Sequence, residues 1–353
     1  MKKYFSFITL LVSIFSCSQN EDLSTTEKSL YFPPLTDNYW ETITPSELNW
    51  NENKIEPLLA YLEEKHTKSF IILYNGRIVI EKYFGDHSES KPWYWASAGK
   101  TLTSIITGIA EEKGLLNINN KVSDYLGSGW TSAPIEKENL ITSKHLLSMT
   151  SGLDDNLGDE VSPANLQYLS DAGTRWAYHN VYVKLQDVIE TTSKQSFSTF
   201  FNTNLRDKIG MTGTWFQTGD FSVYYSNTRS MARFGLLAFN KGTWNTTRIV
   251  NEDFFINSIN TSQNINKAYG YLWWLNGKSS YHLPQSQFEF QGKLIPNAPN
   301  DLYAALGKND QKIYISPSKK LVIIRMGESS EGTNFALSNF DNELWGKINF
   351  VIN

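Results

Sequence analysis

Apolar residues recur at two different spacings in the first third of the chain, and the spacing distinguishes helix from strand. Ile55, Leu58, Leu59 and Leu62 follow a helical interval, which predicts a helix with one face packed on a core. Two apolar runs follow, at 69–74 and 77–83, separated by Asn75-Gly76. Because Asn-Gly readily adopts the positive φ angles of a tight turn, we expect these runs to form a β-hairpin.

The rest of the chain has a helical middle and a β-rich end. An apolar stripe after Ser97 predicts a long amphipathic helix that Gly114 is suited to end; its members are Leu102, Ile105, Ile106 and Ile109. We expect further helices at 181–192, 229–240 and 342–352, and short strands at 312–315 and 321–326. Strands near both ends with helices between them predict a lobe built from both termini, with a mostly helical lobe inserted.

The first residues have a different character from the rest. Lys2 and Lys3 precede an apolar run, Tyr4 to Phe15, that is too short to span a bilayer as a stable helix. The run ends in Ser16-Cys17, and a small residue before a cysteine at such a place resembles a bacterial lipoprotein signal. The alternative is an unmodified cysteine in a membrane anchor.

We therefore expect three segments: a signal peptide at 1–16, a lipidated Cys17 with a flexible tether at 17–39, and a folded domain at 40–353. On this reading the protein is a lipid-anchored lipoprotein of the cell envelope, on its periplasmic or cell-surface face. Its partners are then the membrane, through Cys17, and a small molecule, and we expect a monomer.

Composition excludes several classes of function. The net charge is −4 and no long run of Lys or Arg occurs, so nucleic-acid binding has no electrostatic support. Cys17 is the single cysteine, which leaves the mature domain without a disulfide or a thiolate metal site. The five histidines lack metal-ligand spacing, and we expect neither a metal nor an organic cofactor. Aromatic residues reach 14%, and Trp273-Trp274 fit core packing and the wall of a substrate pocket equally well.

Ser97-Ala98-Gly99-Lys100 is the strongest candidate for nucleophilic chemistry. Side chains three residues apart share one helix face, so the Lys100 amine can reach the Ser97 hydroxyl. A serine hydroxyl needs such help, and a helix N-terminus favours the developing negative charge. The same spacing occurs at Ser88–Lys91 and Ser316–Lys319, but only Ser97 follows the predicted hairpin and precedes a long apolar stripe.

Tyr178-His179-Asn180 is the candidate second element. A Tyr178 phenolate stabilised by a lysine can take the serine proton, and Asn180 can donate to a substrate carbonyl and accept from a lysine. Tyr225-Ser226-Asn227 is a rival of the same pattern. We prefer Tyr178 because a helical segment follows it directly. His145 is expected to be structural, and His179 is a weaker candidate for the cleft.

Three further stretches, read with Ser97–Lys100, resemble one family. They are 145–153 (HLLSMTSGL), 209–214 (IGMTGT) and 230–235 (SMARFG). The chain resembles the β-lactamase-related serine hydrolases nearest class C, a group that includes D-alanyl-D-alanine carboxypeptidases, carboxylesterases and 6-aminohexanoate-dimer hydrolase. The resemblance runs from about residue 70 to 327. It implies an α+β fold of the serine β-lactamase and penicillin-binding-protein kind, with an antiparallel sheet flanked by helices, a mostly helical lobe and the active site between them.

The family's third element, Lys-Thr-Gly or His-x-Gly on a strand lining the cleft, matches residues 308–311. The resemblance places Lys308 at the cationic position and the backbone N–H groups of Ser97 and Gln311 in the oxyanion hole. Asp310 stands where the family has glycine. We expect Asp310 to line the cleft, pair with Lys308 and repel a substrate carboxylate, which disfavours β-lactams and cell-wall peptides.

Three functions compete at this point. The preferred one is hydrolysis of a small ester or short amide through a Ser97 acyl-enzyme, with Lys100 and Tyr178 moving the proton. The second is a penicillin-binding carboxypeptidase or β-lactamase. The third is a surface lipoprotein that keeps the fold as a binding module without turnover, and the intact Ser97, Lys100 and Tyr178 set argues against it.

Overall fold

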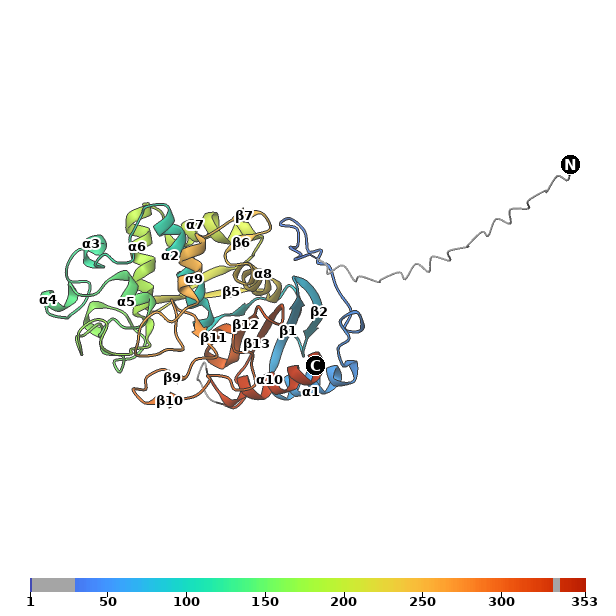
Figure 1. Ribbon diagram of the computed structural model, residues 1–353. Coiled ribbons are helices and arrows are strands. Elements are labelled where there is room, and N and C mark those ends of the chain that lie inside the picture. Colours follow the sequence, from blue (N-terminus) through green and yellow to red (C-terminus); the bar gives the residue numbers. More distant parts are fainter. Residues whose placement is uncertain (2–28, 333–336) are drawn as a thin grey trace.

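A six-stranded antiparallel sheet forms the lobe that contains both ends of the domain (Figure 1). The computed structural model describes Met1, residues 29–332 and residues 337–353. In sheet order the strands are β2 (Arg77–Tyr83), β1 (Thr67–Tyr74), β13 (Leu321–Gly327), β12 (Gln311–Ser316), β11 (Tyr303–Gly307) and β8 (Trp274–Leu275). The N-terminal hairpin thus pairs directly with the C-terminal strand β13, as a lobe built from both termini requires.

The predicted hairpin and the strands at 312–315 and 321–326 are confirmed. Asn75 and Gly76 both have positive φ, at 46° and 84°, so the turn between β1 and β2 takes the conformation that the dipeptide favours. Strand β11 was not predicted, because Ala304-Ala305-Leu306-Gly307 lacks the β-branched residues that mark a strand.

Helices cover both faces of this sheet. α1 (Ile55–Glu64) and α10 (Asn339–Ile352) lie together on one face, and α8 (Thr228–Phe239) packs on the other (Figure 1). Side chains alternate along β12 accordingly: Tyr314 contacts Trp345 of α10, whereas Ile313 lies beneath Gly235 of α8. A Cβ on Gly235 would stand 2.5 Å from Val322, so glycine permits this close helix–sheet approach.

The second lobe is mostly helical, as predicted. Its helices are α2 (Lys100–Glu112), α3 (Ser123–Leu126), α4 (Ile135–Glu138), α5 (Ser143–Leu147), α6 (Lys184–Ser193), α7 (Phe197–Phe201) and α9 (Glu252–Ser258). α2 is buried on every side from Lys100 to Ala110, so it is the central helix of the lobe rather than an amphipathic surface helix. The expected helix at 181–192 corresponds to a short 3₁₀ turn followed by α6.

The helical lobe also holds a small sheet that the sequence analysis did not predict. Its order is β3 (Trp93–Tyr94), β5 (Phe221–Ser226), β4 (Thr214–Thr218). Two further hairpins lie outside the main sheet: β6 (Thr243–Trp244) with β7 (Thr247–Arg248), and β9 (Ser280–His282) with β10 (Glu289–Gln291). The three-stranded sheet matters for function because β3 leads directly into Ser97.

The folded part begins before residue 40, which corrects the expected tether at 17–39. The Tyr31 N–H donates to the Asn75 carbonyl, Arg233 donates to the Pro34 carbonyl, and the Phe32 ring packs 5.1 Å from that of Trp244. Residues 29–39 are therefore part of the domain. Cys17 and the expected signal peptide lie outside the described residues, apart from Met1. Within the described part of the chain, no helix is both long and apolar enough to cross a membrane.

Candidate active site

Ser97 lies where the two lobes meet, in a 3₁₀ turn (Ala96–Gly99) that continues into α2. Trp95 anchors this turn: its backbone N–H donates to the Tyr224 carbonyl at 2.9 Å and its indole donates to Ser226 Oγ at 2.8 Å. Ala96 has φ of 46°, a left-handed conformation that a residue with a Cβ rarely adopts. Such strain is typical of a position where the chain must present the next side chain in one direction.

The Lys100 amine lies beside the Ser97 hydroxyl. Lys100 Nζ lies 2.8 Å from Ser97 Oγ. Burial lowers the pKa of Lys100 to about 7, although the nearby Asp159 carboxylate acts in the opposite direction. The rings of Tyr178 and Tyr182 surround the amine, with centroids 5.1 and 4.6 Å from Nζ. A substantial fraction of Lys100 is therefore neutral near pH 7 and can accept the serine proton.

Tyr178 also lies beside Ser97. Its hydroxyl is within hydrogen-bonding reach of Ser97 and of the Trp274 indole, and burial raises the pKa of Tyr178 to about 12. The expected phenolate is therefore not the resting form, because a buried tyrosine of this pKa stays protonated at neutral pH. A neutral Tyr178 can still pass a proton between Ser97 and a leaving group.

Asn180 completes the set on the Tyr178 side. Its Oδ1 accepts from Lys100 Nζ at 3.4 Å, and its Nδ2 donates to the Asp159 carbonyl at 3.1 Å. These two contacts orient the amide with its oxygen toward Lys100. The cleft beside it has a volume of about 370 Å³. Aromatic rings form much of its wall: Tyr94, Tyr182, Trp215, Phe221 and Tyr225.

The turn between β11 and β12 forms the opposite wall. Gly307, the last residue of β11, lies so close to the nucleophile turn that a Cβ would stand 2.5 Å from the Trp95 carbonyl and 2.9 Å from Ala98 N. Lys308 follows and lines the cleft. The structure thus brings Lys308 to the same cleft as Ser97, Lys100 and Asn180. Gln311, the first residue of β12, is fully buried, pairs with Gly307 and is not among the residues that line this cleft.

Asp310 does not line the cleft, which corrects the sequence expectation. Its side chain is 1% exposed and accepts hydrogen bonds from Ser330 N and Oγ and from Ser338 Oγ. Its ion-pair partner is Lys312, at 3.1 Å, rather than Lys308. Burial alone would raise the pKa of Asp310, but Lys312, Ser330 and Arg325 together hold it below its usual value. Within the described residues no carboxylate pairs with Lys308, so its charge is available to a substrate.

Comparison with known proteins identifies the family to which this fold and this site belong. Residues 60–343 match the β-lactamase family. The chain belongs to the β-lactamase family. An uncharacterised protein of Alkalihalophilus pseudofirmus is 25% identical over 309 residues, covering 76% of this chain and 86% of that protein. Penicillin-binding protein 4* of Bacillus subtilis is 28% identical over 189 residues, which are 45% of this chain and 40% of that protein.

A solved structure from Bacillus anthracis, described as that of a candidate 6-aminohexanoate-dimer hydrolase, has the same fold. It is 18% identical with a TM-score of 0.68, covering 91% of this chain and 89% of that chain. Together with the family match, this likeness confirms the predicted serine β-lactamase and penicillin-binding-protein fold. Members of the β-lactamase family with this fold are serine hydrolases.

The alternative Ser-x-x-Lys and Tyr-x-Asn motifs in the sequence make structural contacts elsewhere. Lys91 pairs with the exposed carboxylate of Asp86, and Ser316 lies beside Asp301 at a strand end. Tyr225 lines the cleft, but Ser226 and Asn227 serve structure: Ser226 accepts from Trp95 and Asn227 caps α8. His145 forms a capping box with Thr142, as expected for a structural histidine.

Sequence analysis missed residues that shape the site from behind. Tyr182, two residues after Asn180, lies over the Lys100 amine. Trp274 stacks on Tyr178 with ring centroids 5.6 Å apart, whereas the Trp273 ring lies in the core near Phe234. Of the Trp273-Trp274 pair that the sequence analysis singled out, Trp273 belongs to the core and Trp274 supports Tyr178, and neither is among the residues that line the cleft. His179 is buried, and burial together with Lys100 lowers its pKa to about 4. The sequence signal for Tyr182 is its position, because it follows the candidate residues Tyr178 and Asn180 within one helical turn.

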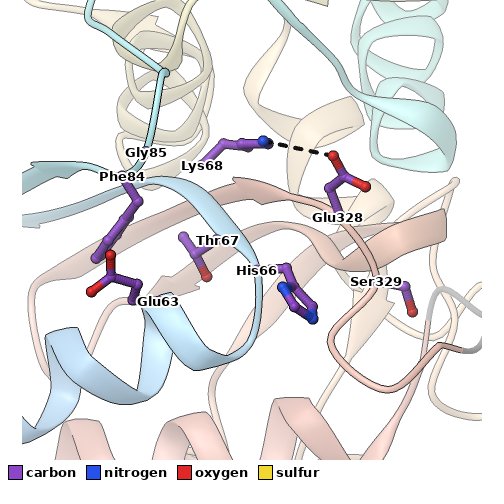
Figure 2. Close-up of a pocket in the computed structure, with 8 residues that line it drawn as sticks. All are labelled: Glu63, His66, Thr67, Lys68, Phe84, Gly85, Glu328 and Ser329. Atoms are coloured by element: carbon purple, nitrogen blue, oxygen red, sulfur yellow. Dashed lines mark ion pairs between the residues drawn. The ribbon is translucent and has the colours of Figure 1, made fainter.

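A second, more open cavity of about 510 Å³ lies at the end of β1 and β13 (Figure 2). Lys68 and Glu328 form an ion pair across it at 3.7 Å, and His66 and Thr67 line its floor. Ser97 and Lys100 are not among the residues that line it, so it is separate from the candidate active site. Among the described residues, no group of three or more His, Cys, Asp or Glu is arranged to hold a metal ion.

Proposed function

We propose that this chain hydrolyses an ester or amide bond through a covalent acyl-enzyme on Ser97. One observation carries the proposal: a buried Lys100 amine, with its pKa lowered to about 7, lies 2.8 Å from Ser97 Oγ in an open cleft. A serine beside an amine that is partly neutral at working pH has the general base that its hydroxyl requires.

The reaction then proceeds in two acyl transfers. Lys100 Nζ takes the Ser97 proton as Oγ bonds to the substrate carbonyl carbon, and the carbonyl oxygen becomes an oxyanion. The backbone N–H of Ser97 stabilises that oxyanion. Collapse breaks the bond to the leaving group, which receives the proton by way of Tyr178. Water next attacks the acyl carbon and gives its proton to Lys100, and Lys100 passes that proton to Ser97 Oγ as the bond to the acyl carbon breaks and the acid is released.

The cleft favours a small substrate with an apolar part. Its volume of about 370 Å³ and its wall of aromatic rings suit a short acyl chain or a compact leaving group. We therefore propose a small ester or short amide as the preferred substrate class. The likeness to a structure described as that of a candidate 6-aminohexanoate-dimer hydrolase supports amides as well as esters.

A second candidate has one observation in its favour. Lys308 lines the cleft without a carboxylate partner among the described residues, so it can bind the carboxylate of a peptide stem or a β-lactam. The similarity to penicillin-binding protein 4* is in keeping with such a substrate. The weak β-lactam turnover expected from the sequence no longer follows, because it depended on Asp310 cancelling Lys308.

A substrate panel separates these functions. Purified wild type and Ser97→Ala are assayed with a short p-nitrophenyl ester, a short neutral amide, nitrocefin and a fluorescent penicillin. The proposal predicts Ser97-dependent turnover of the ester or the amide. Stable labelling by penicillin without ester turnover would favour a penicillin-binding role. No turnover and no labelling would contradict the proposal and favour a binding module.

We also propose that a lipid on Cys17 holds the protein at the cell envelope. The support is the apolar run that ends at Ser16. Cys17→Ser, compared with wild type by membrane fractionation and intact mass, is expected to lose both membrane association and the lipid mass. Unchanged membrane association, with no lipid mass on the wild type, would contradict the anchor.

A further inference from the structure

A loop and a hairpin turn from different parts of the chain meet at the edge of the catalytic cleft. The loop, residues 156–160, precedes Tyr178 in the chain, and the turn, residues 218–221, joins β4 to β5. Asp159 of the loop lines the cleft, and so do Thr218 and Phe221 of the turn. The width of the opening between these two segments therefore depends on how they are held together.

One carboxylate holds the loop and the turn together. Glu160 Oε2 accepts a hydrogen bond from the backbone N–H of Asp220 at 2.9 Å, and we call this contact the Glu160 clasp. A charged acceptor makes such a bond stronger than one between neutral groups. Within the described parts of the chain, no other hydrogen bond or ion pair joins residues 156–160 to residues 218–221. Removing the carboxylate is therefore expected to free the turn from the loop.

Gly219 leaves the space that the Glu160 carboxylate occupies. Its φ of 57° lies in the left-handed region that favours glycine. A Cβ at this position would stand 2.7 Å from Glu160 Oε2, which is too close for both atoms to keep their places. A side chain at residue 219 would consequently displace the carboxylate from the Asp220 N–H. The clasp thus depends on a residue on each side of the opening.

The loop itself is fixed on both sides of Glu160. The Asp159 carbonyl accepts from Asn180 Nδ2 at 3.1 Å, and Asn180 Oδ1 accepts from Lys100. Val161, the next residue along the loop, is 1% exposed and belongs to the core. A loop held at both neighbours of Glu160 cannot follow the turn if the turn moves away. The clasp therefore sets the distance between the hairpin turn and the catalytic side of the cleft.

The side chains of the hairpin indicate which kind of group the clasp limits. Trp215, Phe221 and Val223 of β4 and β5 line the cleft and offer apolar contact to a hydrocarbon chain. The cleft has a volume of about 370 Å³. A short acyl chain fits within these walls, whereas a long one requires the loop and the turn to separate.

We propose that the Glu160 clasp sets the upper length of the acyl group that Ser97 accepts, an inference that rests on the proposed function. Glu160 is a specificity-determining residue because it closes the opening between Asp159 and Phe221. It is not among the residues that line the cleft, so its effect passes through the position of the hairpin turn. The substrate class that follows is an ester or amide of a short acyl group.

The experiment measures kcat/KM for p-nitrophenyl acetate and p-nitrophenyl octanoate, with the rate of Ser97→Ala subtracted. Glu160→Ala removes the clasp. Its octanoate-to-acetate ratio is expected to exceed that of the wild type by about 10-fold or more, because pockets discriminate strongly for each methylene they exclude. Glu160→Gln keeps an oxygen that can accept from Asp220, and its ratio is expected to lie between the two. An unchanged or lower ratio in Glu160→Ala would overturn the inference.

Gly219→Ala tests the clasp from the hairpin side. Its Cβ displaces the Glu160 carboxylate, so the octanoate-to-acetate ratio is expected to rise in this variant as well. In a Glu160→Ala background the same Cβ meets no carboxylate, and the turn is already free. Gly219→Ala is therefore expected to add little there, as for two residues that share one contact. Effects that multiply in the double variant would overturn the inference.

Gln217→Ala is the matched control. Gln217 Nε2 donates to the Gly219 carbonyl at 2.7 Å, so its replacement loosens the same turn while the clasp remains. The ratio is expected to stay at the wild-type value. An equal rise in Gln217→Ala and Glu160→Ala would overturn the inference, because a looser turn would then explain both.

The wild type separates a failure of this inference from a failure of the proposed function. Ser97-dependent turnover of the acetate ester, with one ratio shared by wild type and all the variants, would overturn the role of Glu160 alone. A wild type without Ser97-dependent turnover of either ester would overturn ester hydrolysis as the function, and the inference with it.

Discussion

Asp310 Oδ1 lies 3.1 Å from Lys312 Nζ, and this buried ion pair leaves Lys308 as an uncompensated cation in the catalytic cleft. Lys308 and Lys312 are four residues apart and have different surroundings. Lys312 belongs to a buried cluster of charges, whereas Lys308 lines the catalytic cleft. Lys308 therefore offers a positive charge to a substrate in a cleft that Asp159 also lines.

Lys308→Met tests what that charge binds. Loss of one charge-assisted hydrogen bond is expected to raise KM for a carboxylate-bearing substrate by about 10-fold or more. The KM for a neutral ester is expected to change by less than about threefold, because the ester offers no anion to lose. Steady-state kinetics with one substrate of each kind, and exposed Lys113→Met as control, measure the difference. Equal effects on both substrates would show that Lys308 does not select for a carboxylate.

The Lys100 amine predicts a defined pH profile. Burial lowers its pKa to about 7, and only the neutral amine can take the Ser97 proton. Protonation below that pKa removes the base, so kcat/KM is expected to fall about tenfold per pH unit below pH 7 and to level off above it. Lys100→Ala is expected to lose about 10²-fold or more in acylation and to lose this pH dependence as well. A wild-type profile that is flat from pH 5 to 8 would contradict Lys100 as the base.

Tyr178 and Tyr225 both stand at the site and are expected to differ sharply on replacement. The Tyr178 hydroxyl reaches Ser97, so Tyr178→Phe is expected to reduce acylation about 10²-fold. Tyr225→Phe is the matched control and is expected to be nearly silent, because Tyr225 lines the cleft without joining Lys100 or Ser97. Combined with Lys100→Ala, Tyr178→Phe is expected to add far less than its separate effect, since the two groups form one proton-transfer unit. Greater damage from Tyr225→Phe in single-turnover acylation would reverse the assignment.

Much of the fold could be predicted from local patterns. The 55–62 helix, the Asn75-Gly76 hairpin and the closing helix each follow from a spacing or a dipeptide that has one favourable conformation. Strand β11 could not be predicted, because Ala304-Ala305-Leu306-Gly307 lacks the β-branched residues that mark a strand. Strands β4 and β5 form a local hairpin of β-branched and aromatic residues, a signal that the sequence analysis did not use.

The site divides in the same way. Ser97 and Lys100 are one helical turn apart, so a sequence can place them together. Asp310 could not be placed from the sequence: the direction of its side chain depends on positive φ at residues 309 and 310 and on Ser338, which lies 28 residues away. Asp310 stands where the family has glycine, and this suggested a residue of the cleft. In the structure its carboxylate is buried and hydrogen-bonded instead.

Acylation of Ser97 is the central claim, and intact-mass spectrometry with a fluorophosphonate serine-hydrolase probe tests it most directly. The probe bonds covalently to an activated serine oxygen and loses fluoride, so one added mass is expected on the wild type. Peptide mapping is expected to place that mass on Ser97, and Ser97→Ala, folded to the same melting temperature within a few degrees, is expected to carry none. An unmodified wild type, or equal labelling of Ser97→Ala, would contradict the account.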